Sequence, residues 1–214
     1  MIRPRQRGFT LIEILLATAL LASGLALAFT TLRAATATAT RGESLAQRSE
    51  RMRAVAGFLR ARLVAARPVP FDLDEETGLA RRFRGEPDRM AFVADLPDYL
   101  GRGGPYLHRF TVEGGRGKQR IEVGFQPVQA GAVVESPEPL APEVLVERLR
   151  AVRFRYRGLD AQQHLGDWQS SWEVPEALPL QVEIRVEDGQ GRAWPPVVVA
   201  LPLAGSYAVP AGAP

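Results

Sequence analysis

The feature that most constrains this chain is an apolar run near its N-terminus. Residues 9–32 form a stretch of 24 residues in which Glu13 is the single charged side chain. A helix of that length extends about 36 Å, enough to cross a bilayer core of about 30 Å. A lone carboxylate in such a segment costs roughly 2.5–3.5 kcal/mol on insertion scales. Glu13 therefore indicates a function and needs a partner that neutralises it.

Three arginines at positions 3, 5 and 7 precede the run and predict a cytoplasmic N-terminus, with the rest of the chain beyond the membrane. A secretory signal has a shorter apolar centre of about 7–15 residues, followed by its cleavage site. A simple uncleaved anchor fits the length but leaves Glu13 unexplained. Cleavage before the run explains both features, with Gly8 ending a basic leader and Phe9 as the new N-terminus.

The residues around this position resemble the class III signal of the type IV pilin-like superfamily. That signal is a basic leader followed by Gly, Phe, Thr, Leu, an aliphatic residue and Glu. The matching residues are Gly8, Phe9, Thr10, Leu11, Ile12 and Glu13. The resemblance implies that a prepilin peptidase cuts between Gly8 and Phe9 and methylates the new amine of Phe9.

The chemistry of Glu13 agrees with this resemblance. Cleavage would make Glu13 the fifth residue of the mature chain, about one helical turn from the new amine. A carboxylate in lipid must be paired or protonated. The amine of an adjacent subunit in a filament could neutralise Glu13, which would favour assembly and set the axial register. The alternative is a protonated glutamate with no role.

A long helix is predicted for residues 9–67, since no proline occurs between Pro4 and Pro68. Beyond Gly42 an apolar stripe predicts an amphipathic face that packs under a sheet, with arginines at 48, 51, 53, 60 and 62 beside it and pointing to water. The residues of the stripe are Leu45, Met52, Val55, Ala56, Leu59, Leu63 and Ala66. Pro68 and Pro70 end the helix.

From Phe71 onward, short alternating segments predict antiparallel strands over residues 89–95, 106–113, 119–125, 152–156, 180–187 and 194–203. Residues 114–117 are typical of a hairpin turn, and residues 126–142 are expected to form an excursion loop. The predicted class is α+β, a long helix packed on a mostly antiparallel β domain of two sheets or a partial barrel. The expected divisions are a leader (1–8), a helix (9–67, membrane-spanning over 9–32) and a periplasmic β domain (68–214).

Catalytic and metal-binding patterns are weak in this sequence. It has no cysteine, which excludes disulfides and thiolate sites. His108 and His164 are expected to be surface or packing residues, and the serines 136, 170, 171 and 206 lack a nucleophile-elbow context. Trp168 and Trp172 are expected to anchor the β core, with a partner-facing role for one of them as the alternative. We expect no enzyme activity and no cofactor.

The overall charge and the acidic cluster do not indicate nucleic-acid binding or a metal site. The net charge of +3 and pI of about 9.8 come with acids mixed among the arginines, so nucleic acid is not an expected partner. The cluster of acidic residues within 72–76 does not have the spacing of an EF-hand loop, and we expect a solvated loop, with calcium binding as the alternative. Its members are Asp72, Asp74, Glu75 and Glu76.

The C-terminal third carries a narrower resemblance, to the minor pseudopilin J family of the type II secretion system. The resemblance rests on three features: residues 152–156, the Gly-Asp-Trp at 166–168 with Trp172, and Leu178-Pro179 before an alternating strand. Residues 161–165 form a longer, polar link than the family pattern has. The length also suits this type better than the smaller H and I types or the larger K type.

This narrower resemblance implies a single-pass protein of the bacterial inner membrane, with a periplasmic C-terminal domain. It also implies a tip complex with the I, K and H subunits and the major pseudopilin, which starts filament assembly and contacts exported substrates or the secretin. A minor pilin of a type IV pilus or a DNA-uptake pseudopilus is the nearest alternative. A membrane-anchored periplasmic enzyme is another, and it would need a cleft with converging titratable groups.

Overall fold

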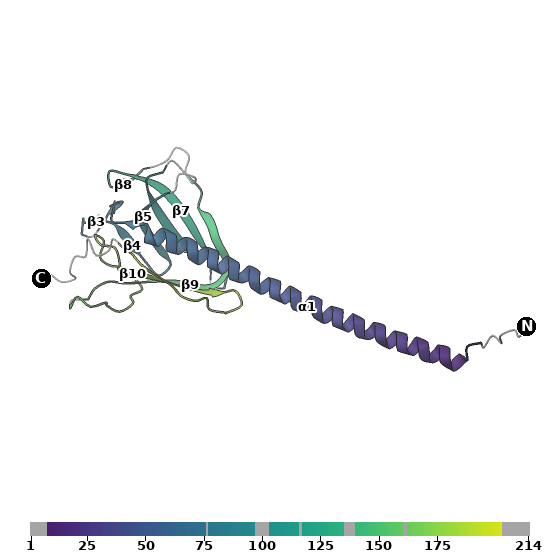
Figure 1. Ribbon diagram of the computed structural model, residues 1–214. Coiled ribbons are helices and arrows are strands. Elements are labelled where there is room, and N and C mark those ends of the chain that lie inside the picture. The colour runs from purple at the N-terminus through teal and green to yellow at the C-terminus, as the bar shows by residue number, and fades with distance from the viewer. Residues whose placement is uncertain are drawn as a thin grey trace, which may run out of the picture. The chain divides into compact units, whose positions relative to one another are not determined.

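A computed structural model describes residues 8–75, 77–96, 103–115, 117–134, 140–160 and 162–202 (Figure 1). The chain forms two compact units, residues 1–51 and residues 52–214. Helix α1 (Leu11–Val64) has 54 residues and contributes to both units. The second unit therefore begins inside the helix, and the division into a leader, a helix and a periplasmic domain stays a prediction.

The described part of the first unit is residues 8–51, which are α1 as far as Arg51 and the three residues before it. Its Ala- and Leu-rich sequence favours a helix, and it contains no proline to interrupt one. Residues 35–40 alternate alanine with threonine, a poor helix former. These threonines do not break the helix, because Thr36, Thr38 and Thr40 each donate a hydroxyl hydrogen bond to the carbonyl four residues earlier.

The predicted helix end at Arg67 is wrong by three residues. After Val64 the chain turns at Ala65, and β1 (Ala66–Arg67) pairs antiparallel with β5 (Arg89–Asp95), with Ala66 opposite Ala94. Pro68 disfavours helical backbone at Arg67, and the pairing of Ala66 and Arg67 with β5 draws the chain out of the helix earlier. Ala66, placed on the helical stripe by the sequence, is instead buried in a strand.

The second unit is built on a nine-stranded sheet whose described pairings are all antiparallel. Its main path is β1-β5-β6-β7-β9-β10-β11, with β4 beside β5 and β8 beside β7; β2 and β3 form a separate two-stranded sheet. The remaining bounds are β2 (Asp72–Leu73), β3 (Ala80–Arg81), β4 (Phe83–Gly85), β6 (Pro105–Glu113), β7 (Gln119–Gln129), β8 (Ala132–Val133), β9 (Glu143–Arg157), β10 (Gln181–Asp188) and β11 (Val197–Ala200).

Most strand predictions are confirmed, and three boundaries need correction. The strand predicted over 152–156 begins much earlier, since β9 starts at Glu143 and pairs there with β7. The loop expected over 126–142 is wrong at its start, because β7 continues to Gln129 and pairs with both β6 and β8. Burial explains the extension, since Val128 packs in the core. The last strand is shorter than predicted and begins at Val197, after Pro195 and Pro196, which have no backbone N–H for a sheet hydrogen bond. Residues 135–139 and 203–214 lie outside the described part.

The last turns of α1 pack on one face of the sheet. Val55, Leu59 and Leu63 are buried there, at the four-residue spacing of one helix face. Phe58 meets Phe110 of β6 edge to face, with 6.4 Å between ring centroids. The sequence stripe is thus confirmed within the second unit. Leu45, the first residue of the predicted stripe, lies in the first unit and is 58% exposed, so it is not part of the buried face.

Two arginines of the helix contact the protein and do not point freely to water as predicted. Arg60 donates a hydrogen bond to the carbonyl of Val198 (3.1 Å). Arg62 lies over the ring of Phe58, and its Nη1 is 3.5 Å from the carbonyl oxygen of Asp95. Long arginine stems cover apolar surface in this way while the charge stays near a polar partner.

The other face of the sheet carries a smaller core cluster of five buried residues: Phe71, Ala91, Val93, Leu107 and Val128. β5 is therefore buried on both faces, which explains its nearly continuous apolar sequence.

Isolated bridges tie residues 169–172 between β4 and β9. Gly85 of β4 bridges Trp172, and Tyr156 of β9 bridges Gln169. This arrangement closes part of the sheet on itself, as a partial barrel does.

Candidate functional site at the N-terminal helix

The predicted processing site lies where the described chain meets α1. Thr10 caps the helix: its carbonyl accepts from the backbone N–H of Glu13 (3.1 Å) and Ile14 (3.2 Å), and its Oγ1 is 3.3 Å from the Glu13 nitrogen. Threonine followed three residues later by glutamate is the capping-box pattern, so these two residues mark the helix start. Glu13 stands in the first turn, where the helix dipole favours a negative charge.

Gly8 is exposed, and a Cβ added there would meet nothing within 4 Å among the described residues. Nothing in the described part of this fold therefore requires glycine at that position. A requirement for glycine would come from outside the chain, as with an enzyme that binds this segment. Phe9 is 79% exposed. The cleavage between Gly8 and Phe9, and the pairing of Glu13, remain predictions.

The apolar side chains of the first unit lie on the surface of α1. Leucines, isoleucines and a phenylalanine between residues 11 and 32 are more than half exposed. This is the one helix of the described residues with the length and composition to cross a membrane, and none of its apolar window is buried in the protein. An exposed apolar surface of this size is stable only in an apolar medium or against another protein.

Most polar side chains of this segment form hydrogen bonds within the helix itself. Thr18, Ser23, Thr30 and Thr31 donate their hydroxyl hydrogen bonds to backbone carbonyls three or four residues earlier. Such local bonds let serine and threonine enter an apolar medium at low cost. Glu13 is the exception within the span, since no cation among the described residues neutralises its carboxylate.

The histidines lie in different places. His164 is exposed on a loop, as expected. His108 on β6 is fully buried between Phe92, whose ring is stacked at 5.8 Å, and Phe125, whose ring is edge-on at 4.9 Å. Burial and then the charge of Arg62 lower the pKa of His108 to about 4. It is a packing residue, and the described residues give it no nucleophile to activate.

The acidic cluster forms ion pairs with arginines of β3 and β4. Asp74 pairs with Arg81 and accepts two hydrogen bonds from Thr77, and Asp72 pairs with Arg84 at 3.1 Å. Among the described residues no three acidic or histidine side chains gather as a metal site. Glu76 lies outside them. The calcium alternative gains no support from this geometry.

Trp168 and Trp172 lie in different environments. Trp172 packs against the main core and donates its Nε1 hydrogen bond to the carbonyl of Ala177 (2.8 Å), as expected of a core anchor. Trp168 instead lies against two guanidinium groups, those of Arg157 at 4.3 Å and Arg155 at 5.8 Å. Its predicted role in the core is wrong, because β9 presents its arginines, and not its apolar residues, on that side.

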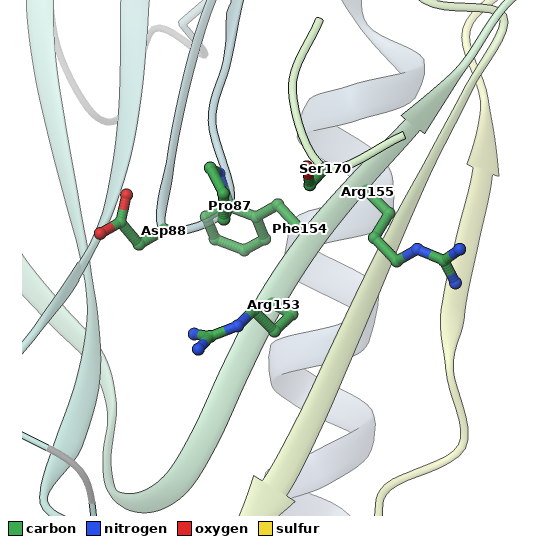
Figure 2. Close-up of a pocket in the computed structure, with 6 residues that line it drawn as sticks. All are labelled: Pro87, Asp88, Arg153, Phe154, Arg155 and Ser170. Atoms are coloured by element: carbon green, nitrogen blue, oxygen red, sulfur yellow. The ribbon is translucent and has the colours of Figure 1, made fainter. Parts of the chain in front are cut away.

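A pocket of about 410 Å³ lies beside the arginines of β9 (Figure 2), and the sequence pattern did not predict it. Its lining residues are Pro87, Asp88, Arg153, Phe154, Arg155 and Ser170. The alternation of arginine with apolar residues along β9 indicated which side chains share a face. It could not predict the pocket, because residues from loops distant in the sequence form the rest of its lining. Ser170 is the one serine candidate in this pocket, and no histidine lines it. Ser136 and Ser206 lie outside the described residues.

Comparison with known proteins gives three findings. Residues 3–29 match the family model described as the prokaryotic N-terminal methylation motif. Over 204 residues the chain is 52% identical to the type II secretion system protein J of Xanthomonas campestris pv. campestris, and the match covers 95% of this chain and 96% of that protein. A solved structure, the GspK-GspI-GspJ complex from the enterotoxigenic Escherichia coli type 2 secretion system, contains a chain that matches with a TM-score of 0.48 and 19% identity, over 71% of this chain and 96% of that chain.

Proposed function

The chain belongs to the type II secretion system protein J family, and from that premise we propose that it acts in the tip complex of the secretion pseudopilus. The observation that carries the proposal is 52% identity along 95% of the chain. In this role the protein helps to start filament assembly and thereby aids the export of folded proteins across the outer membrane. It has a structural role and catalyses no reaction.

The exposed apolar helix supports a membrane anchor for this protein. Residues 9–32 would lie in the inner membrane, with the three leading arginines on the cytoplasmic side and residues 68–214 in the periplasm. During assembly the same helix would leave the lipid and enter the filament, where apolar helices of other subunits surround it.

Processing would occur between Gly8 and Phe9. The match of residues 3–29 to a methylation motif supports this site. Prepilin peptidase would cleave there and methylate the amine of Phe9. The exposed, uncrowded Gly8 would allow the peptidase to bind the backbone closely.

Glu13 would then neutralise the amine of a neighbouring subunit. Its position in the first helical turn, one turn from the new N-terminus, supports this pairing. In a low-dielectric filament core an amine and a carboxylate attract strongly, whereas either one alone is costly. The pair would therefore favour correctly registered subunits over misaligned ones.

The proposed partners are the I, K and H pseudopilins in the tip complex and the major pseudopilin below it. The solved complex of GspK, GspI and GspJ contains two of these partner types beside its J subunit. Exported substrates and the secretin are further proposed contacts of the periplasmic unit.

Two measurements test the proposal. Intact-mass analysis of the membrane-extracted protein should find a chain that begins at Phe9 and carries one added methyl group. Gly8→Arg should leave a precursor that still begins at Met1, because a bulky cation cannot enter the peptidase site. A native protein that still begins at Met1 would refute the processing step.

The assembly step is tested with Glu13→Leu in cells that lack the wild-type protein. The variant should be processed and inserted, yet co-purify poorly with the other pseudopilins and restore little secretion. Glu43→Leu is the matched control, since Glu43 is exposed on the same helix beyond the apolar run. Normal secretion with Glu13→Leu would contradict the pairing.

A further inference from the structure

One face of β9 and β10 carries more arginines than carboxylates. Along β9, arginines alternate with residues whose side chains are buried, so the arginines share the outward side. Arg185 on β10 lies opposite Arg153 in the register. We define the arginine face by these four residues: Arg153, Arg155, Arg157 and Arg185.

A single buried carboxylate serves two of these arginines. The side chain of Glu183 is 5% exposed and lies 3.1 Å from Arg155 and 2.9 Å from Arg185. Glu183 therefore fixes both guanidinium groups in place but neutralises only one of the two positive charges. One positive charge of this cluster remains to be balanced.

The other two arginines bind neutral groups. Arg157 donates two hydrogen bonds, of 2.8 and 2.6 Å, to the side-chain oxygen of Gln181. Arg153 donates to the carbonyl of Val152 at 3.0 Å. Within the described residues neither forms an ion pair. The face thus holds a net positive charge in a defined geometry.

Trp168 holds part of the face in place. Its ring lies against the guanidinium groups of Arg155 and Arg157, and its carbonyl oxygen is 3.4 Å from Arg155 Nη2. Stacking on an aromatic ring restricts an arginine while its N–H groups stay free to donate. Such restriction lowers the entropy cost of binding a ligand.

The pocket beside the face offers apolar surface. Figure 2 shows the side chain of Arg153 extending toward the side of Asp88 and that of Arg155 extending the opposite way, with the ring of Phe154 and Pro87 between. A glutamate side chain combines a methylene stem with a carboxylate. Its stem would contact Pro87 at the pocket rim, since the ring of Phe154 is itself buried in the core, while its carboxylate reaches Arg153.

We propose that the arginine face docks an extended acidic segment of a partner protein. Alternate residues of a strand are about 6.6 Å apart, and an extended peptide presents the side chains of one face at the same spacing. Carboxylates four positions apart on the peptide, at about 13 Å, would therefore meet Arg153 and Arg157 through paired N–H donors. The acids mixed among the arginines along the chain disfavour a nucleic acid, so an acidic peptide is the occupant that the charges favour.

This inference goes beyond the tip-complex role, because it assigns a partner chemistry to the β unit. The N-terminal segment that carries the assembly proposal is not used by it. Binding to the face can therefore be measured with purified protein, and either proposal can fail while the other stands.

The test measures binding of a fluorescent peptide of about eight residues, with glutamate and serine alternating, to the full chain in neutral detergent. Fluorescence anisotropy should show saturable binding that weakens with added salt. Arg153→Gln and Arg157→Gln should each weaken it roughly threefold to tenfold, as expected for loss of one charged hydrogen-bond pair. Arg153→Lys should bind with intermediate affinity, since it keeps the charge but not the paired donors.

Arg109→Gln is the matched control, because Arg109 is exposed on β6 and does not belong to the arginine face. Unchanged far-UV circular dichroism would show that each variant keeps its fold. The proposal is overturned if the variants bind like the wild type, or if a peptide with glutamine in place of glutamate binds equally well. It is also overturned if a single-stranded oligonucleotide displaces the peptide more readily than unlabelled peptide does.

Discussion

Burial of His108 should make the stability of the β unit depend on pH. Its ring is 0% exposed, and within the described residues neither ring nitrogen has a hydrogen-bond partner. Charging an imidazole in such a place costs solvation, and the nearby Arg62 opposes the charge further. The backbone of Ala94, which faces the ring without meeting hydrogen-bond geometry, and then the Asp95 carboxylate act in the other direction but do not restore the ordinary pKa.

The sign and size of the effect follow from the pKa in the two states. The pKa of His108 is about 4 in the folded protein and about 6.5 when unfolded. Between these values the unfolded chain binds more protons, so the free energy of unfolding falls as the pH is lowered. From pH 7 to pH 5 the loss attributable to His108 is about 2 kcal/mol.

Urea unfolding of the full chain in detergent measures this effect, because the three tryptophans 168, 172 and 194 all report on residues 52–214. His108→Leu should raise the free energy of unfolding at pH 7 by about 1–3 kcal/mol, since two unpaired buried nitrogens are removed. The difference between variant and wild type should grow by about 2 kcal/mol at pH 5.

Carboxylates also titrate in this range, but they are common to both proteins and cancel in the difference. His164→Gln is the control, since it removes the exposed histidine without altering the core. A difference between His108→Leu and wild type that stays constant from pH 7 to pH 5 would refute the reasoning.

Three further variants test the packing by urea unfolding. Gly85→Ala should cost roughly 1–3 kcal/mol, because its Cβ would lie 2.8 Å from the ring of Tyr156; a neutral result would mean that the ring moves. Leu59→Ala should cost about 2–5 kcal/mol as a large-to-small change at a fully buried helix position, and a cost under 1 kcal/mol would argue against the helix packing on the sheet. Glu183→Gln should cost about 3 kcal/mol or more, since it leaves two guanidinium groups facing an uncharged amide, and salt should reduce that cost.

The N-terminal half of the molecule was predictable because its signals are local. A helix needs only contacts between neighbouring turns, so the missing prolines and the apolar run specify α1 without information from the rest of the chain. Its true end at Val64 required a distant strand, since Ala66 and Arg67 leave the helix to pair with β5.

Strand alternation likewise predicted which residues share a face but not what covers each face. Along β6, His108 lies in an alternating segment, and only the packing of α1 and the neighbouring strands buries it. The same is true of Trp168, which the sequence pattern placed in the core and the fold places on two arginines.

The membrane-length helix with its one carboxylate was determined by sequence alone, because length, composition and charge order decide whether a segment suits lipid. Tertiary structure alone decided which charges of the β unit are balanced. Arg155 and Glu183 are 28 residues apart in the chain and meet only through the register of β9 and β10. Register depends on long-range pairing, which a local sequence pattern does not contain.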